Sequence, residues 1–310
     1  MKIVVTGASS FTGYHLAAGY RRGGAEVIAM VGPGKERTGI EAARLARLAE
    51  HEIPIVVADL TDPAGVIRMG KEIRPDVWVQ HAGYTKGYGG WDYDFERGLA
   101  VNMKPLAAIY EVVGQIEGQL ILTGTVSEYS DSDAAHEESD NCQPSLPYGL
   151  TKLAGTLRAR QLAERYQVPT RVARLFLPIG PLDAPGKLLS SALDSLQRRA
   201  PIALSPCEQR RDFLHIDDVA ALYQRLLHDF SGSLFEIYNV CAGESPSLKS
   251  VLLTCCELLG AEAELCQFGA IPMRPGEPPV IRGSNAKAKA RLDWAPRPWK
   301  EAVQRFCEGH

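Results

Sequence analysis

Short apolar runs alternate with amphipathic stretches through the first half of the chain. The first run, Ile3–Val5, has no polar interruption, which is typical of a parallel strand covered on both faces. Further strands are predicted over 25–31, 55–59, 77–81, 120–123 and 170–176. Helices are predicted between them over 14–22, 63–73, 99–116 and 148–166. This alternation predicts an α/β fold built on a doubly wound parallel sheet with right-handed crossovers.

The second half of the chain does not continue the regular alternation of strands and helices. Prolines and glycines between Pro178 and Gly186 mark a loop. Helices are then predicted over 188–199, 217–228 and 248–259. Ser245 or Ser247 is a candidate N-cap of the last one. The stretch 272–279 is rich in proline, so we expect a smaller unit in this half.

The first predicted strand leads into a turn of small residues and then into a helix. The turn consists of Gly7, Ala8, Ser9, Ser10, Phe11, Thr12 and Gly13. Such a turn lets the backbone approach a pyrophosphate, and the helix N-terminus supplies free N–H groups and the positive end of the helix dipole. Ser10 stands where the usual fingerprint has a second glycine. The pattern favours a dinucleotide cofactor site, and the alternative is an ordinary tight turn between strand and helix.

These patterns together predict two domains. We expect residues 1–175 to form an NAD(P)-binding Rossmann domain. We expect residues 176–310 to form mainly a smaller C-terminal substrate-binding domain. The chain is expected to return to the large sheet near 212–242, so the boundary between the domains is soft.

Composition and charge narrow the classes of partner. The 310 residues carry a formal net charge of −3, which gives no reason to expect nucleic acid or an acidic membrane surface. No apolar run approaches the roughly 20 residues that span a bilayer, and the N-terminal run breaks at Thr6 and Gly7, unlike a signal peptide. The seven cysteines show no zinc-type spacing, and Cys255 and Cys256 are expected to be core thiols. We expect a reducing compartment, the cytoplasm.

Tyr148 and Lys152 lie four residues apart at the start of a predicted helix that Pro147 suits as a first residue. Their side chains therefore share one helix face. A nearby ammonium stabilises tyrosinate and lowers the tyrosine pKa towards working pH. Such a tyrosine can exchange a proton with a substrate oxygen while hydride moves on a nicotinamide. The alternative is a surface tyrosine beside a solvated lysine.

Hydroxyl side chains gather where the fifth predicted strand ends. The segment LTGTVSEYS, residues 122–130, places Thr123 and Thr125 at the carboxyl edge of the sheet. Ligands bind at that edge in open α/β sheets. Either threonine could hydrogen-bond a substrate oxygen, and both could be plain strand-end threonines, which β propensity favours.

Several motifs lie in a fixed order along nearly the whole chain. They are TGASSFTG (6–13), VADLTD (57–62), HAG (81–83), AVNMK (100–104), PYGLTK (147–152), RRDFLHIDDVA (210–220), YNVCAG (238–243) and RPGEPP (274–279). In this order they resemble the extended short-chain dehydrogenase/reductase family, in its nucleotide-sugar branch. Within that branch, TGTVSEY (123–129) and RVARLFLPIGP (171–181) are similar to GDP-4-keto-6-deoxy-D-mannose reductases.

The resemblance implies roles for the matching positions. It implies Thr125 as the hydroxyl that hydrogen-bonds the substrate oxygen, Tyr148 as acid/base and Lys152 as its modulator. Besides Tyr148 and Lys152, it implies cofactor contacts for Gly7, Ser9, Ser10, Phe11, Thr12, Gly13, Asp59, Leu60, His81, Ala82, Gly83 and Asn102. Thr123 competes with Thr125 for the hydroxyl role, and Thr125 is preferred because of its register with the tyrosine of the motif.

The resemblance also implies that Arg211 and Arg274 hold a substrate diphosphate. Guanidinium suits phosphate because it offers forked donors and stays charged. The alternatives are a salt bridge from Arg211 to Asp212 and a surface loop charge at Arg274. Leu177 departs from the family, which usually has an asparagine there that contacts the sugar nucleotide.

The segment after Thr125 bears on the type of reaction. Sugar 4,6-dehydratases need an acid and a base one and two residues after the catalytic threonine, where this chain has Val126 and Ser127. This favours simple hydride transfer, in a reductase or a 4-epimerase. A shift of register by one residue would bring Glu128 into that role.

The end of the second strand bears on the choice of cofactor. An acidic residue there would bind the ribose 2′-hydroxyl of NAD and repel a 2′-phosphate. This chain has Val31, with Lys35 and Arg37 close by, so we expect NADP rather than NAD. The alternative is a solvated charged loop.

Three functional hypotheses follow. The first is an NADP(H)-dependent reductase of a 4-keto-6-deoxy nucleotide sugar. The second is an NAD-dependent nucleotide-sugar 4-epimerase or 4,6-dehydratase. The third belongs to another class, a non-catalytic sensor or scaffold that binds NADP. The resemblance also implies a homodimer that forms through the helices at 99–116 and 148–166.

Overall fold

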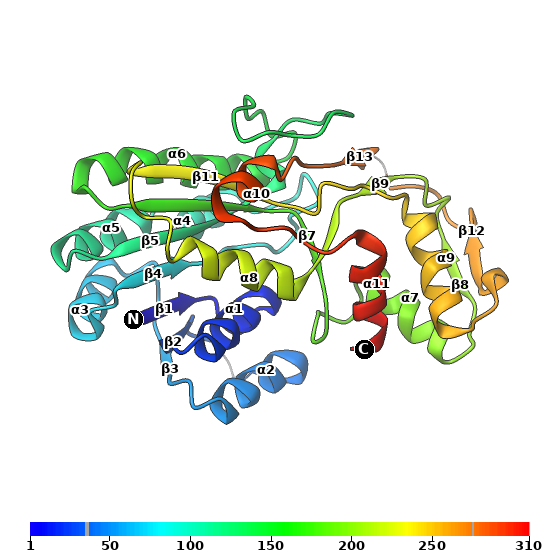
Figure 1. Cartoon of the computed structure of the whole chain (residues 1–310), viewed down its shortest axis with the longest axis horizontal. Helices are drawn as coiled ribbons and strands as arrows, with labels where there is room; N and C mark the ends of the chain where they lie inside the picture. The colour runs from blue at the N-terminus through cyan, green and yellow to red at the C-terminus, as the bar shows by residue number, and fades with distance from the viewer. Residues whose placement is uncertain (35–36, 275, 310) are drawn as a thin grey trace.

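The centre of the molecule is a sheet of seven parallel strands in the order β3-β2-β1-β4-β5-β6-β11 (Figure 1). This computed structural model describes residues 1–34, 37–274 and 276–309. The strands are β1 (Lys2–Thr6), β2 (Glu26–Val31), β3 (Ile55–Val57), β4 (Val77–Gln80), β5 (Gln119–Thr125), β6 (Thr170–Leu175) and β11 (Phe235–Val240). The order reverses between β1 and β4, where the carboxyl ends of the strands leave a crevice for a ligand. The predicted doubly wound α/β fold is confirmed.

Helices cover both faces of the sheet. One face carries α3 (Pro63–Ile73), α4 (Phe95–Asn102), α5 (Leu106–Gln115) and α6 (Pro147–Tyr166). The other face carries α1 (Phe11–Arg22), α2 (Gly39–Glu50), α8 (Ile216–Leu226) and α10 (Ala286–Leu292). A buried apolar cluster lies on each side of the sheet, which explains why its strands are apolar on both faces.

A smaller lobe stands at one end of the sheet, on the right in Figure 1. Its helices α7 (Leu188–Gln197), α9 (Leu248–Leu259) and α11 (Trp299–Glu308) enclose a third apolar cluster. Short strand pairs that are separate from the large sheet lie in the second half of the chain: β7 (Leu177–Ile179) with β10 (Phe213–His215), β8 (Ile202–Leu204) with β12 (Cys266–Phe268), and β9 (Arg210–Arg211) with β13 (Val280–Ile281). Two short 3-10 helices are η1 (Val126–Glu128) and η2 (Ala263–Leu265). Ser247 is the N-cap of α9, and Cys255 and Cys256 are buried free thiols, as predicted.

The predicted helix over 99–116 is wrong, because the structure has two helices there, α4 and α5. The break lies at Met103–Pro105, and Pro105 is the N-cap of α5. Proline has no N–H to continue the α4 hydrogen bonds, and it disfavours helical backbone at Lys104 before it. The apolar periodicity runs on across the break, which is why the pattern alone predicted one helix.

Helix α2 was not predicted. Only Arg44 and Leu48 of its residues are buried, so its apolar face is narrow. Arg44 lies against the first turn of the chain, where it donates to the carbonyl oxygen of Ser9 at 3.0 Å. Leu48 packs into the apolar core, but the polar contact of Arg44 is one that hydrophobic periodicity does not report.

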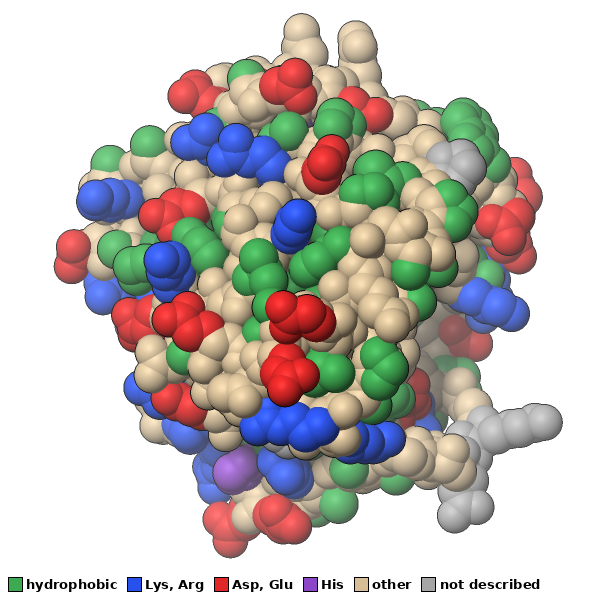
Figure 2. Space-filling view, turned by 90° about the vertical axis from the view of Figure 1, so that its right-hand side faces the viewer, with side chains coloured by type: hydrophobic (Ala, Val, Ile, Leu, Met, Phe, Trp, Pro, Cys, Tyr) green, Lys and Arg blue, Asp and Glu red, His purple; other side chains and the backbone are tan. Residues whose placement is uncertain are grey.

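The exposed surface of the smaller lobe mixes side chains of several kinds. Acidic, basic and apolar side chains lie interspersed over this end of the molecule (Figure 2). Within the described ranges, no helix combines the length and the apolar character that crossing a membrane requires.

Candidate active site

Two glycines shape the turn between β1 and α1. Gly7 has a φ of +70°, and a Cβ there would lie 2.8 Å from the Cα of Ala82. A Cβ on Gly13 would overlap the carbonyl oxygen of Gly7. Both positions therefore require glycine. Ser10, the departure from the fingerprint, is the N-cap of α1, and its Oγ accepts the N–H of Gly13 at 3.0 Å.

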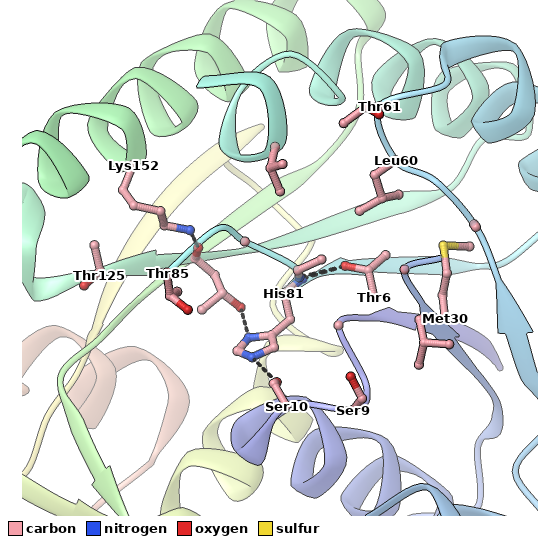
Figure 3. A pocket seen from close by; sticks show the side chains of 18 of the residues that line it. Thr6, Ser9, Ser10, Met30, Leu60, Thr61, His81, Thr85, Thr125 and Lys152 are labelled. Atoms are coloured by element: carbon pink, nitrogen blue, oxygen red, sulfur yellow. Dashed lines mark hydrogen bonds between the residues drawn. The ribbon is translucent and has the colours of Figure 1, made fainter. Parts of the chain in front are cut away.

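A pocket of about 480 Å³ opens beside this turn, at the carboxyl edge of the sheet (Figure 3). The predicted residues that line it are Gly7, Ser9, Ser10, Asp59, Leu60, His81, Ala82, Gly83, Thr125, Tyr148 and Lys152. The pocket extends from the ends of β2 and β3, past the N-terminus of α1, to the start of α6. This set of groups fits a dinucleotide: helix N–H groups in the middle for phosphate, and a tyrosine with a lysine at one end.

Other predicted cofactor residues lie behind the pocket wall or cannot be placed. Phe11, Thr12 and Gly13 are buried in the first turn of α1, so Phe11 and Thr12 would reach a cofactor through backbone N–H groups, whereas the N–H of Gly13 is donated to Ser10 Oγ. Lys35 lies outside the described residues. Residues that line the pocket and were not predicted include Thr6, Met30, Pro33, Thr85, Arg97 and Phe176.

Asn102 holds the pocket wall in place. Its Oδ1 accepts the N–H of Tyr84 at 2.8 Å, and its Nδ2 donates to the Thr151 hydroxyl at 2.9 Å and to the Tyr93 hydroxyl at 3.2 Å. The Tyr93 hydroxyl donates in turn to the carbonyl oxygen of Tyr84 at 3.0 Å. Asn102 thus links the segment after β4 to helix α6, and it is not among the residues that line the pocket.

Among the described residues, none that lines the pocket at the end of β2 is acidic. Val31 and Gly32 form this part of the wall, and Arg37 donates to the carbonyl oxygen of Gly32 at 2.6 Å. Across the pocket, Asp59 accepts two hydrogen bonds from Thr61, and these lower the pKa of its carboxyl group. Thr61, two residues further along the same loop, thereby fixes the orientation of the Asp59 carboxylate.

Tyr148 and Lys152 reach the pocket from the first turns of α6. The side chain of Thr125, at the end of β5, lines the pocket with Tyr148 and acts to lower the pKa of the tyrosine. Lys152 Nζ donates to the carbonyl oxygen of Thr123 at 2.7 Å. Burial raises the pKa of Tyr148 above its ordinary value, and burial lowers the pKa of Lys152. The prediction that Lys152 lowers the pKa of Tyr148 towards working pH is therefore wrong, because burial raises this pKa and keeps the hydroxyl protonated at neutral pH.

The two candidate threonines have different surroundings. Thr123 is buried, and its hydroxyl contacts His81 Nδ1 at 3.0 Å and the Tyr223 hydroxyl at 2.7 Å. Both threonines line the pocket, and Thr125 is the one that is only partly buried. The geometry therefore favours Thr125 as the hydroxyl that meets a substrate.

Glu128 points away from the pocket and is fully buried. One carboxylate oxygen accepts the backbone N–H of Thr125 at 2.9 Å. The other accepts from the Thr156 hydroxyl at 2.9 Å and lies 3.0 Å from Arg174 Nε in an ion pair. Its oxygens are thus occupied by three partners, and it fixes the backbone that carries Thr125. The structure therefore does not place Glu128 in the pocket as a base, which a shift of the catalytic motif by one residue would require.

A second pocket, of about 880 Å³, lies between the smaller lobe and the segment 87–92 that follows β4. It is lined by Leu177, Arg211, Arg274 and Glu277, and Arg211 lies 2.6 Å from Glu277 in an ion pair. The alternative salt bridge from Arg211 to Asp212 is wrong. The Asp212 carboxylate instead accepts three backbone N–H groups, those of Ala242, Gly243 and Gly283.

Aromatic side chains mark the junction of the two pockets. The rings of Tyr88 and Tyr93 stand edge-on to Tyr148, with centroids 5.8 and 5.7 Å from it. Tyr88 lines the second pocket, whereas Tyr148 lines the first. Neither Tyr88 nor Tyr93 was predicted, because their segment follows β4 without periodicity and only the fold brings it to α6.

Comparison with known proteins places the chain in a family. Residues 3–241 match the model of the NAD dependent epimerase/dehydratase family. GDP-6-deoxy-D-mannose reductase of Pseudomonas aeruginosa is 30% identical over 162 residues, and that match spans about half of each protein, 49% of this chain and 51% of the reductase.

Similarity also extends over the whole length. A dTDP-6-deoxy-L-talose 4-dehydrogenase (NAD(P)(+)) of Kitasatospora kifunensis is 26% identical, with 98% of this chain and 93% of the relative covered. The crystal structure of UDP-glucuronic acid 4-epimerase from Bacillus cereus, in complex with UDP-glucuronic acid and NAD, superimposes with a TM-score of 0.86 at 21% identity, over 100% of this chain and 98% of that one. This likeness shows the shared fold. The family match over most of the chain shows more: the protein is an enzyme of the NAD dependent epimerase/dehydratase family, the extended short-chain dehydrogenases/reductases.

Proposed function

We propose that the protein is an NADP(H)-dependent reductase of a 4-keto-6-deoxy nucleotide sugar. The observation that carries this proposal is the position of Tyr148, which lines the first pocket with Thr125 and stands edge-on to Tyr88 of the second pocket. A cofactor in the first pocket and a sugar nucleotide in the second would meet there.

When bound, the cofactor would supply hydride to C4 of the sugar. The residues that would hold it are those of the turn after β1, with Asp59 and Leu60 at the adenosine end. We favour NADP over NAD because no carboxylate stands at Val31 or Gly32 and Arg37 lies beside Gly32. Family membership by itself fits NAD as well.

The proton comes from Tyr148. Because burial keeps its pKa high, the hydroxyl is protonated and can donate to the substrate oxygen as negative charge develops there. Thr125 orients that oxygen through its hydroxyl. Lys152, whose Nζ is fixed on the carbonyl oxygen of Thr123, lies one helical turn after Tyr148 on the same pocket and would contribute positive charge there as the proton leaves.

The substrate class follows from the second pocket. Arg211 and Arg274 offer two guanidinium groups to a diphosphate, and Leu177 adds an apolar surface where a polar contact is usual. Two similar proteins, the reductase of Pseudomonas aeruginosa and the dehydrogenase of Kitasatospora kifunensis, are named for 6-deoxy sugar nucleotides. These names support a 6-deoxy sugar.

Two other functions make different predictions. A 4-epimerase would hold its cofactor through purification and would not turn over added NADPH. A 4,6-dehydratase is disfavoured by Val126, Ser127 and the engaged carboxylate of Glu128. A non-catalytic sensor or scaffold that binds NADP would be unaffected by Tyr148→Phe, and the assembled Thr125, Tyr148 and Lys152 argue against it.

We further propose a homodimer that forms through α5 and α6. These two helices pack on each other, and α6 leaves Leu150 and Leu157 exposed, at 46% and 59%. The cytoplasm is the proposed location, which the seven free thiols support.

The test of the proposed function is a thermal-shift screen. NADPH, NADH and NADP are added alone and together with GDP, UDP, dTDP or CDP. We expect stabilisation by NADPH and a further shift with one nucleotide diphosphate, after which the matching 4-keto-6-deoxy sugar is assayed for NADPH oxidation. A shift with cofactor and with no diphosphate would contradict the nucleotide-sugar substrate.

A further inference from the structure

Four side chains form a continuous hydrogen-bonded chain from the core to the first pocket. The Tyr223 hydroxyl contacts the Thr123 hydroxyl at 2.7 Å, and Thr123 Oγ1 contacts His81 Nδ1 at 3.0 Å. His81 Nε2 contacts Ser10 Oγ at 3.1 Å. Ser10 and His81 line the pocket, and Figure 3 shows the imidazole between the β5 hydroxyl and Ser10. The chain joins β4, β5, α1 and α8.

The buried end of this chain sets its direction. Tyr223 is fully buried, and within the described ranges its hydroxyl has one partner, Thr123. A tyrosine hydroxyl has one proton, and a buried proton without an acceptor is costly. Tyr223 therefore donates to Thr123. The Thr123 hydroxyl must in turn place its own proton on an acceptor, and His81 Nδ1 is the acceptor within reach.

The same reasoning fixes the other end. Burial, with a smaller effect of the Lys152 charge, lowers the pKa of His81 to about 3, so its ring is neutral and carries one N–H. If Nδ1 accepts, the proton is on Nε2, and His81 donates to Ser10 Oγ. Ser10 Oγ also accepts the N–H of Gly13 at 3.0 Å. Both of its lone pairs are then used, and its own O–H is left to point into the pocket.

We propose that Ser10 is a hydrogen-bond donor to a phosphate oxygen of the bound dinucleotide, and that His81 and Tyr223 fix the direction of that donor as positioning residues. Ser10, which stands where the usual fingerprint has glycine, would thus add a charge-assisted hydrogen bond to the phosphate, and His81 would orient it. The reversed direction would point the Ser10 proton at His81 and leave Tyr223 without an acceptor. This proposal rests on the dinucleotide site of the proposed function and on no particular sugar.

The direction is tested by nitrogen NMR of the histidine rings. The full-length protein is labelled with ¹⁵N-histidine at neutral pH, and His81→Asn identifies the signals of His81. We expect a neutral ring with the proton on Nε2. A neutral ring with the proton on Nδ1, or a charged ring, would overturn the proposed direction. In Tyr223→Phe the buried proton is gone, and we expect a measurable fraction of the Nδ1–H form.

The contact with phosphate is tested by calorimetric binding of NADP, ADP and adenosine. Ser10→Ala is expected to weaken NADP and ADP about tenfold and to leave adenosine within about twofold, because adenosine has no phosphate. Ser10→Thr keeps a hydroxyl and is expected to bind like the wild type. Ser10→Gly controls for the helix cap, since glycine caps with little loss, and it should match Ser10→Ala.

Two results would overturn the contact. One is an equal loss of ADP and adenosine binding in Ser10→Ala, which a merely structural role would produce. The other is unchanged ADP binding in that variant. If the wild type binds neither ADP nor NADP, the proposed function fails and the phosphate contact fails with it, whereas the tautomer of His81 still reports whether the direction was inferred correctly.

Discussion

Arg211 and Glu277 face each other in the second pocket, with Arg211 Nη2 2.6 Å from a carboxylate oxygen of Glu277. The two residues are 66 positions apart in the sequence, and Glu277 also accepts from Gln209 Nε2 at 3.3 Å. The guanidinium that is proposed to hold a diphosphate is therefore engaged by an anion of the protein itself. A ligand phosphate has to compete with this carboxylate.

This competition predicts opposite effects for two variants. Arg211→Met is expected to weaken nucleoside diphosphate binding about 10- to 100-fold, since it removes a charged donor. Glu277→Gln is expected to strengthen it about threefold or more, because the competing charge is gone. Titration calorimetry with the diphosphate that the screen identifies checks both, and the matching nucleoside is the control. Weaker diphosphate binding in Glu277→Gln would mean that Glu277 holds the ligand rather than Arg211.

Tyr148→Phe removes the proposed proton donor. We expect the rate constant of carbonyl reduction to fall about 10³-fold, within the range of general acid catalysis, while NADPH affinity stays within about twofold. Because the pKa of Tyr148 is raised, the wild-type rate of reduction should change little around neutral pH and decline only on the alkaline side. Stopped-flow and steady-state NADPH oxidation measure both effects. An active Tyr148→Phe would contradict the assignment.

Gly32→Asp tests the choice of cofactor. Gly32 lines the first pocket, and a Cβ there meets nothing within 4 Å, so the variant should fold normally. The new carboxylate would repel a 2′-phosphate and accept from ribose hydroxyls. We expect NADPH to bind at least about tenfold more weakly and NADH to bind as well or better. Gly32→Asn separates charge from size, and equal losses for both cofactors would argue against the proposed NADP site.

His81 should make the fold sensitive to acid. Its pKa is about 3 in the folded protein and about 6.5 when unfolded, so the unfolded chain binds the extra proton and stability falls as pH drops below about 6.5. Between pH 7 and 5 we expect His81→Asn to lose about 1–2 kcal/mol less unfolding free energy than the wild type.

The measurement is urea unfolding at several pH values, with the exposed His51→Asn as control. Burial raises the pKa of Asp212 to about 7, and this acts with the opposite sign in every variant, so only the difference between variants reports on His81. Parallel curves for His81→Asn and the wild type would show that the imidazole is not kept neutral.

Leu157→Glu tests the proposed dimer. Leu157 is 59% exposed on α6, and a carboxylate there would be costly to bury in an interface. We expect the mass in solution to fall from dimer to monomer. Leu258→Glu, at a 43% exposed leucine of α9, should leave the mass unchanged. A wild-type protein that is a monomer by light scattering would remove the dimer altogether.

Local patterns were enough for six strands of the large sheet, β1 to β6, and for the first half of the site. Helix α3 begins at Pro63 and ends at Ile73 as predicted, because its start signal and periodicity are local properties. The phosphate turn and the four-residue spacing of Tyr148 and Lys152 are also local, so they could be found without knowing what packs on them.

The remaining contacts of the site could be found only in the tertiary structure, because they join residues that are far apart in the chain. The sequence by itself determined a doubly wound sheet, its small-residue turn and a tyrosine–lysine helix. Only the fold assigned Glu277 to Arg211, turned Glu128 away from the pocket onto Arg174, and tied Ser10 through His81 to Tyr223. The physical reason is that hydrogen bonds and ion pairs act over a few ångströms, and only packing decides which distant side chains come that close.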